Sequence, residues 1–280
     1  MPVTLLGAAE IRSLAAELDV TPTKKLGQNF VVDANTVRKI VSAARVAPGE
    51  HVVEVGPGLG SLTLAILEAG ASVTAVEIDH RLAARLPQTA LAHGVDADAL
   101  TVIDSDALAV RELPGEPTVL VANLPYNVSV PVLLHFLEHF PHIRRGVVMV
   151  QAEVGERVAA APGSKVYGVP SAKAAWYGSW RLAGTVSRQV FWPVPNVDSV
   201  LVAFERDTDV RGSDDERRAT FGLIDAAFGQ RRKMLRQALS PALGGSSTAA
   251  SAVLERAGVA PTARGEDLSV EDFLRIARSL

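Results

Sequence analysis

The sequence predicts an α/β domain with a mostly parallel sheet, followed by a small all-helical domain. Two observations support this prediction. Short runs rich in β-branched residues alternate with helical segments in the first half of the chain, which is typical of βαβ units. These runs are 51–55, 71–79, 101–104, 118–123 and 146–151. A charged stretch follows Arg206, and only helical periodicity is found after it, so we expect domains at residues 1–206 and 207–280.

The elements follow one another in a clear order. Apolar residues at helical spacing predict a helix over 8–20, and a loop over 21–33 leads to a helix that Pro48 and Gly49 end. A glycine-rich turn after the first strand leads to a predicted helix at 61–70, and further helices are predicted at 81–86 and 130–140. The pattern changes after Gln151. It predicts, in order, a helix at 152–160, strands at 174–180, 185–192 and 199–205, and helices at 220–243, 251–258 and 269–280.

Composition excludes several classes of protein. Of the 280 residues, 48% are hydrophobic and none is cysteine, which excludes a disordered chain, a thiolate nucleophile and a cysteine-based zinc site. The 28 basic residues nearly balance the 31 acidic ones, so the net charge of −3 does not favour nucleic-acid binding over the whole chain. No targeting segment and no apolar run of membrane length is visible, so a cytoplasmic location is expected.

A glycine-rich turn follows the first strand of the sheet. Glu54 precedes it, and the three glycines are Gly56, Gly58 and Gly60, a spacing that differs from a dinucleotide fingerprint. A carboxylate beside the turn disfavours a pyrophosphate but attracts a sulfonium cation. Glu77 and Asp106 follow the next two strands, where they can accept hydrogen bonds from ribose hydroxyls and an adenine amino group. The alternative is a tight turn with ordinary surface acids.

The tetrapeptide Asn123-Leu124-Pro125-Tyr126 ends the fourth strand, where ligands bind in open α/β sheets. The Asn123 side-chain oxygen and the Leu124 carbonyl can accept the two hydrogens of an exocyclic amine and so aim its lone pair at a methyl donor. Pro125 stiffens the turn, and Tyr126 offers a ring for stacking on a base. An ordinary turn with a partly buried tyrosine is the alternative.

Taken together, the motifs resemble the ribosomal RNA adenine N6-dimethyltransferase family, specifically its bacterial small-subunit members. The resemblance covers nearly the whole chain. Its matching segments are KKLGQNFVVD (24–33), EVGPGLGSLT (54–63), VEID (76–79), SDAL (105–108), NLPY (123–126), residues 151–168, FWPVPNVDSVLV (191–202) and FGQRRKMLRQAL (228–239). The sequence departs from the family at Val31-Val32, where leucine is usual after QNF.

The resemblance implies a class I, Rossmann-like methyltransferase fold with a mostly parallel seven-stranded sheet. It implies S-adenosylmethionine as cofactor, held by Asn29, Val31, Gly56, Glu77, Asp106 and Asn123. The implied reaction places two methyl groups on N6 of each of two adjacent adenosines in a hairpin loop near the 3′ end of 16S rRNA, in the small ribosomal subunit. Phe191 is implied to stack on the target base opposite Tyr126; the alternative is a core aromatic.

Clusters of basic residues are candidates for RNA phosphate contacts. They are Lys24, Lys25, Arg144, Arg145, Arg231, Arg232, Lys233 and Arg236. The last four lie in one predicted helix, with Arg232 and Arg236 one turn apart. Removing Arg231, Arg232 and Lys233 is expected to lower the salt slope of RNA binding by about three units. The alternative is a solvated helix face.

Three other functions remain possible from the sequence. His135 and His139 fit a zinc-peptidase pattern, but the surrounding apolar residues favour a solvated histidine face and no metal. A methyltransferase of the macrolide-resistance type would modify 23S rRNA instead. A third possibility is an assembly factor that binds rRNA without catalysis. We expect a monomer without membrane contact.

Overall fold

A seven-stranded sheet with the order β4-β3-β2-β5-β6-β9-β7 forms the centre of the first part of the chain. The computed structural model describes residues 2–20, 29–125 and 128–280. The strands are β2 (His51–Val55), β3 (Ser72–Glu77), β4 (Leu100–Asp104), β5 (Val119–Asn123), β6 (Arg145–Gln151), β7 (Gly178–Val186) and β9 (Ser199–Arg206). Pairs from β4 to β6 are parallel, and β9 runs antiparallel to β6. This confirms the predicted mostly parallel seven-stranded sheet.

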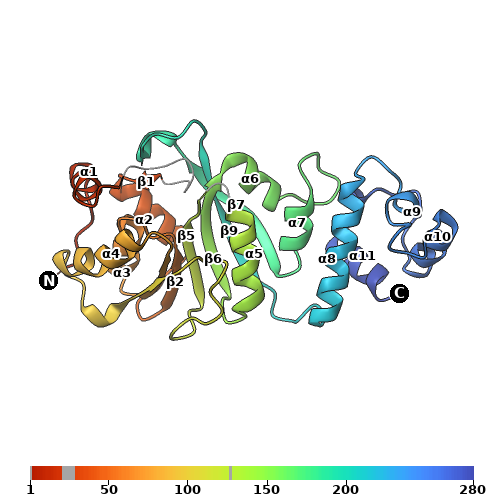
Figure 1. Ribbon diagram of the computed structural model, residues 1–280, viewed down its shortest axis with the longest axis horizontal. Coiled ribbons are helices and arrows are strands. Elements are labelled where there is room, and N and C mark those ends of the chain that lie inside the picture. The colour runs from red at the N-terminus through yellow and green to blue at the C-terminus, as the bar shows by residue number, and fades with distance from the viewer. Residues whose placement is uncertain (1, 21–28, 126–127) are drawn as a thin grey trace. The chain divides into compact units, whose positions relative to one another are not determined.

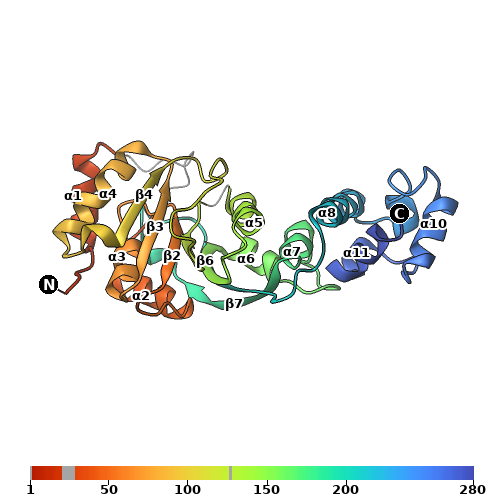
Figure 2. The ribbon, with the colours of Figure 1, turned by 90° about the horizontal axis from the view of Figure 1, so that it is seen from below.

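Helices cover both faces of this sheet. They are α1 (Ala8–Glu17), α2 (Ala34–Ala43), α3 (Ser61–Glu68), α4 (His80–Ala92), α5 (Ser129–His139) and α6 (Ala152–Val158). Figures 1 and 2 show α2 and α3 on one side of the sheet and α5 on the other. Such coverage explains why four consecutive residues of β2 and four of β5 are buried, where a strand with one exposed face would bury alternate residues.

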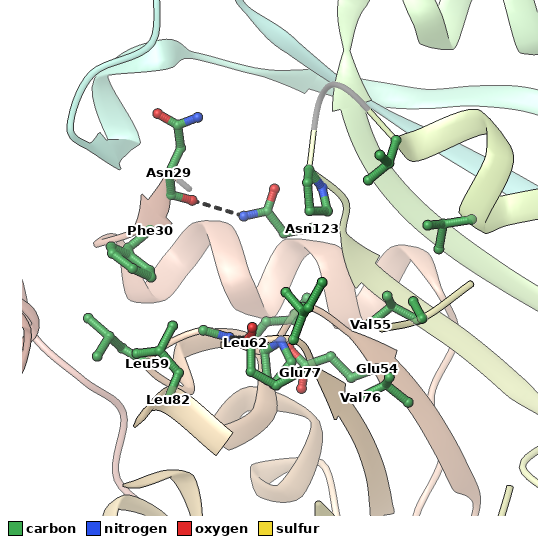
Figure 3. A pocket seen from close by; sticks show the side chains of 18 of the residues that line it. Asn29, Phe30, Glu54, Val55, Leu59, Leu62, Val76, Glu77, Leu82 and Asn123 are labelled. Atoms are coloured by element: carbon green, nitrogen blue, oxygen red, sulfur yellow. Dashed lines mark hydrogen bonds between the residues drawn. The ribbon is translucent and has the colours of Figure 1, made fainter. Parts of the chain in front are cut away.

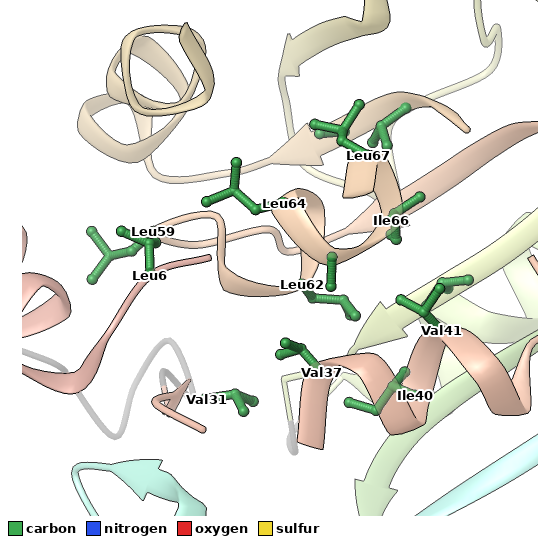
Figure 4. Close-up of a cluster of buried hydrophobic side chains, with 14 of the residues drawn as sticks. Leu6, Val31, Val37, Ile40, Val41, Leu59, Leu62, Leu64, Ile66 and Leu67 are labelled. Atoms are coloured by element: carbon green, nitrogen blue, oxygen red, sulfur yellow. The ribbon is translucent and has the colours of Figure 1, made fainter. Parts of the chain in front are cut away.

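The hydrophobic core on the α2–α3 side holds the amino-terminal part of the chain against the sheet. Val37 and Ile40 of α2 pack with Leu62 and Ile66 of α3 in one buried cluster (Figure 4). The same cluster includes Val31 of β1 (Phe30–Val31), which pairs antiparallel with β8 (Phe191–Trp192). The core therefore fixes β1 in place, and Asn29 comes immediately before it.

The chain divides into two compact units. The first is Met1–Gly155 with Arg181–Arg206, and the second is Glu156–Trp180 with Asp207–Leu280. The second unit contains α7 (Val169–Ala174), α8 (Asp214–Gly229), α9 (Leu235–Ala238), α10 (Ser247–Arg256) and α11 (Val270–Ala277). The chain crosses between the units after Gly155, after Trp180 and after Arg206. The predicted boundary lies near the last of these, and the insertion of 156–180 into the second unit is not predicted. Tyr167 explains this insertion, because its ring packs in the core of the second unit and its hydroxyl donates to the Leu268 carbonyl at 2.8 Å.

Three predicted elements differ from the structure. The predicted strand 174–180 begins as the end of α7, whose first turn accommodates Pro170. The predicted strand 185–192 is split between the end of β7 and β8. The predicted helix 220–243 is broken after Gly229 and resumes at Leu235. No helix in the described part of the chain combines the length and apolar character that a bilayer span requires.

Candidate active site

A cavity of about 250 Å³ lies at the carboxyl ends of β2, β3, β4 and β5. The strand order reverses between β2 and β5, and ligands of open α/β sheets bind at such a reversal. The cavity brings together most of the residues that the sequence predicts for a cofactor: Asn29, Val31, Glu54, Gly56, Gly58, Glu77, Asp106 and Asn123. Its lining also includes apolar residues that were not predicted, among them Leu59, Ile78, Val128 and Val132.

The backbone of the glycine turn passes close to other side chains at two positions. Gly58 has φ +58°, and a Cβ there would lie 2.9 Å from the Phe30 ring. Gly60 has φ +101°, and its Cβ would lie 2.7 Å from Leu86. Other residues are strained at such φ values, so both positions need glycine. Gly56 and Gly58 line the cavity, whereas Gly60 packs against α4 and is not among the lining residues.

The carboxylate of Glu77, the last residue of β3, is held by the backbone at both oxygens. Oε2 accepts from the Gly58 N–H at 3.0 Å, and Oε1 accepts from the Asp79 N–H at 2.9 Å. Burial raises the pKa of Glu77, and the N–H groups of Asp79 and Gly58 oppose that rise. Each oxygen keeps a further lone pair, so the carboxylate can still accept hydrogen bonds from a ligand diol.

Glu54 differs from its prediction as a charge beside the turn. Its side chain is 1% exposed, and its Oε2 accepts a hydrogen bond from the Thr63 hydroxyl at 2.6 Å. Burial raises the pKa of Glu54 to about 8, against the Thr63 hydrogen bond and with a contribution from the nearby Glu77. Without a ligand the group is therefore mainly protonated at neutral pH, and because a bound sulfonium cation would favour the charged form, its attraction to that cation stays a prediction.

Glu54 makes the stability of the fold depend on pH. The folded-state pKa of about 8 exceeds the ordinary 4.5, so the folded protein holds more protons between these values. The free energy of unfolding should therefore fall as pH rises from about 5 to about 8, by at most about 1.4 kcal/mol per pH unit from this group. The variant Glu54→Gln should flatten that slope in urea denaturation measured across this range. An unchanged slope would show that Glu54 titrates normally.

Asn123, the last residue of β5, has a fixed amide orientation. Its Nδ2 donates to the Asn29 carbonyl at 3.0 Å (Figure 3). Because only the nitrogen of an amide can donate to a carbonyl, this contact directs the side-chain oxygen away from Asn29. Pro125 also lines the cavity. The Leu124 side chain is buried, and the Leu124 backbone N–H donates to the Met149 carbonyl at 3.1 Å. Tyr126 lies outside the described residues.

Two other predicted site residues have different surroundings. The Asp106 side chain lines the cavity, and its Oδ1 accepts from the Leu108 N–H at 2.9 Å. Phe191 pairs with Val31 in the β1–β8 ladder and is only 2% exposed. Its ring belongs to the buried cluster of the first unit, as the alternative of a core aromatic expects. Stacking of Phe191 on a base opposite Tyr126, which lies outside the described residues, stays a prediction.

Two predicted RNA-binding cations of the first unit, Arg144 and Arg145, lie away from the cavity. Arg145 is paired with Val119 at the start of β5, about 13 Å along the strand from Asn123. Its guanidinium forms hydrogen bonds with both carboxylate oxygens of Glu50, at 2.7 and 2.6 Å. Arg144 is exposed next to it at the same edge. Arg145 therefore forms a structural ion pair with Glu50. Lys24 and Lys25 lie outside the described residues.

The cations of the second unit differ in availability. Arg231 is bound to Glu266 at 2.8 Å and to the Lys165 carbonyl at 3.0 Å. Arg232 and Lys233 are exposed in the turn between α8 and α9, and neither forms an ion pair with a described residue. Arg236 is half-buried in α9, whereas Arg232 lies in the turn before that helix, so the prediction that one helical turn separates them is wrong.

The two histidines of α5 pack against each other and lie close to backbone carbonyls. The rings of His135 and His139 stack with their centroids 4.3 Å apart. His135 Nε2 lies 2.8 Å from the Val110 carbonyl, and His139 Nδ1 lies 3.0 Å from the His135 carbonyl. Within the described residues, no group of three or more His, Cys, Asp or Glu side chains is arranged to hold a metal.

Over nearly its whole length, the chain is similar to ribosomal RNA methyltransferases. The family model "Ribosomal RNA adenine dimethylase" matches residues 21–280. A protein of Leifsonia xyli named ribosomal RNA small subunit methyltransferase A is 68% identical, with 98% of each chain covered. The protein of the same name from Streptomyces coelicolor is 60% identical and covers 99% of this chain and 97% of its own length.

Solved structures show the same fold. A dimethyladenosine transferase from Plasmodium falciparum has a TM-score of 0.74 at 24% identity, covering 87% of this chain and 94% of that one. The 23S rRNA methyltransferase ErmE has a TM-score of 0.67 at 25% identity, covering 90% of this chain and 99% of that one.

Proposed function

Because this chain belongs to the ribosomal RNA adenine dimethylase family, we propose that it dimethylates N6 of two adjacent adenosines in a hairpin loop near the 3′ end of 16S rRNA. The methyl donor is S-adenosylmethionine, and the substrate lies in the small ribosomal subunit, in the cytoplasm. The enzyme acts as a monomer, with a methyltransferase domain over 1–206 and a helical domain over 207–280. The observation that supports this most strongly is the oriented amide of Asn123 at the rim of the cavity.

The residues of the cavity fit S-adenosylmethionine. Glu77 offers a carboxylate, fixed by two backbone N–H groups, to a ribose diol. Asp106 is positioned by Leu108 to accept from the adenine amino group. Gly56 and Gly58 leave room for a ligand close to the backbone, next to Asn29 and Val31. When bound, S-adenosylmethionine supplies an electrophilic methyl group on a sulfonium sulfur.

Asn123 performs the step that the target base needs. The lone pair of adenine N6 is delocalised into the ring, so the amine is a poor nucleophile. An acceptor on N6–H favours a pyramidal nitrogen and aims its lone pair, which is positional and electrostatic catalysis. The anchor to the Asn29 carbonyl keeps the Asn123 oxygen in place for this purpose. No strong base is required, because the N6 proton becomes acidic once the nitrogen is positively charged.

The choice of 16S rather than 23S rRNA rests on the relatives. ErmE shares the fold at 25% identity, whereas the small-subunit enzyme of Leifsonia xyli is 68% identical over nearly its full length. Primer extension on both rRNAs tests the choice in a strain that lacks the gene. The expected result is loss of a pair of adjacent stops in 16S rRNA, restored by the gene on a plasmid. Loss of a stop in 23S rRNA alone would contradict the proposal.

Exposed cations of the second unit are proposed to contact RNA phosphates. Neutralising Arg232 and Lys233 together, both as glutamine, should lower the log–log salt slope of small-subunit binding by about two units if each contacts one phosphate. The matched control is Arg231→Gln, whose guanidinium is already paired with Glu266 and should change the slope much less. Filter binding between 50 and 200 mM salt measures the slope, and an unchanged slope in the double variant would refute the contact.

A further inference from the structure

Two segments that form one wall of the cavity are joined by a polar contact outside it. Ser105, Asp106 and Leu108 line the cavity from the loop that follows β4. Val132 lines it from α5, the helix that follows the Asn-Leu-Pro-Tyr motif. The loop has no backbone ladder with α5, so side chains must set its position relative to the helix.

His135 supplies one of those side chains. It lies one turn after Val132 on α5, and its Nε2 is 2.8 Å from the Val110 carbonyl. Arg111 Nη1 lies 2.8 Å from the Leu108 carbonyl and 3.1 Å from the Val110 carbonyl. The two hydrogens of Nη1 can serve these two carbonyls, which leaves His135 Nε2–H as a second donor to Val110. The loop is thus held at two backbone carbonyls, those of Leu108 and Val110.

The charges around His135 favour its neutral form. Arg111 Nη1 is 3.0 Å from its Nε2, and the His139 ring stacks on it at 4.3 Å. Burial lowers the pKa of His135, and His139 and Arg111 lower it further, while the Val110 carbonyl and Glu138 act in the opposite direction. A neutral imidazole with its hydrogen on Nε2 donates to Val110 without adding a second cation beside Arg111.

We propose that His135 is a positioning residue for adenine recognition: by binding the Val110 carbonyl, it holds the loop that places Asp106 in the cavity. This inference rests on the proposed function, because Asp106 is the group expected to read the adenine amino group of the cofactor. It gives the histidine pair of α5 a role within the family's reaction rather than in metal binding. Asp106 is in turn tied to the same loop through the Leu108 N–H.

The test compares two ligands that differ at the adenine amino group and at the neighbouring N1, which carries a hydrogen only in the inosine form. Isothermal titration calorimetry with S-adenosylhomocysteine and with S-inosylhomocysteine, which carries an oxygen there, gives a ratio of affinities for each variant. His135→Leu should weaken S-adenosylhomocysteine binding about tenfold and lower the ratio, because it removes one hydrogen bond that positions the acceptor. His135→Gln, which can still donate to Val110, should keep both values within about twofold. His142→Leu, at an exposed histidine beyond α5, is the matched control.

Two results would overturn the role of His135. Loss of affinity for both ligands with an unchanged ratio would show a merely structural role and overturn the proposal, as would wild-type behaviour of His135→Leu. Should that variant fail to fold, Arg111→Leu tests the same loop and must lower the ratio too. A wild-type protein that binds neither ligand would instead refute the proposed function, so the two failures are distinguishable.

Discussion

Replacing Asn123 by alanine is expected to slow methyl transfer by about 100- to 1,000-fold, the usual loss when one oriented polar group that acts in the transition state is removed. The variant loses the acceptor for N6–H and the anchor to the Asn29 carbonyl. Asn123→Asp should also be impaired, because a carboxylate cannot donate to that carbonyl. Single-turnover transfer of a labelled methyl group to unmethylated small subunits measures the rate.

Binding should survive the same change. Asn123→Ala should retain affinity for small subunits within a few-fold, since the proposed phosphate contacts lie elsewhere on the chain. The exposed Asn35 of α2 provides the control, and Asn35→Ala should behave as wild type. If Asn123→Ala kept more than a tenth of the wild-type rate, the role of the amide would be refuted. If the variant restored subunit assembly fully in cells, the assembly function would be independent of catalysis.

Replacing Glu77 by alanine should weaken S-adenosylhomocysteine binding by about 10- to 100-fold, because hydrogen bonds to charged groups contribute about 1.5–3 kcal/mol. Its two oxygens are already oriented by Gly58 and Asp79, so a ligand diol meets a prepared acceptor. Glutamine should not rescue: whichever way its amide turns, an NH₂ group faces a backbone N–H. Calorimetric titration gives the affinity.

The control for Glu77 is a glutamate that lies away from the cavity. Glu68 is paired with Arg38 on the surface at 2.7 Å, and Glu68→Gln should leave the affinity within twofold of wild type. Thermal melting without ligand separates loss of binding from loss of folding. An affinity for Glu77→Ala within twofold of wild type, in a folded protein, would exclude Glu77 as the ribose acceptor.

The sheet and most cavity residues could be predicted because their determinants are local in sequence. Glu77, Asp106 and Asn123 each end or follow a strand, and parallel strands bring their carboxyl ends to one edge of a sheet. The glycine turn was equally visible, because positive φ and close approach demand glycine wherever they occur. In these cases the residue type and its place after a strand were sufficient.

The remaining features depend on contacts between distant parts of the chain. Phe191 is buried by pairing with Val31, 160 residues earlier, and a motif that reads as exposed aromatic gives no indication of this partner. The guanidinium of Arg145 is bound by Glu50, 95 residues away, so its charge is not available. The raised pKa of Glu54 follows from its burial and from neighbouring Glu77, which no linear pattern reports.

Methyl transfer to purified small subunits from cells that lack the modification tests the central claim most directly. The labelled rRNA is mapped to the nucleotide after incubation with wild-type protein, and with Asn123→Ala as the matched catalytic control. The expected result is four methyl groups per subunit, two on each of two adjacent adenosines near the 3′ end of 16S rRNA, and almost none with the variant. Label at another nucleotide, or equal label with Asn123→Ala, would contradict it.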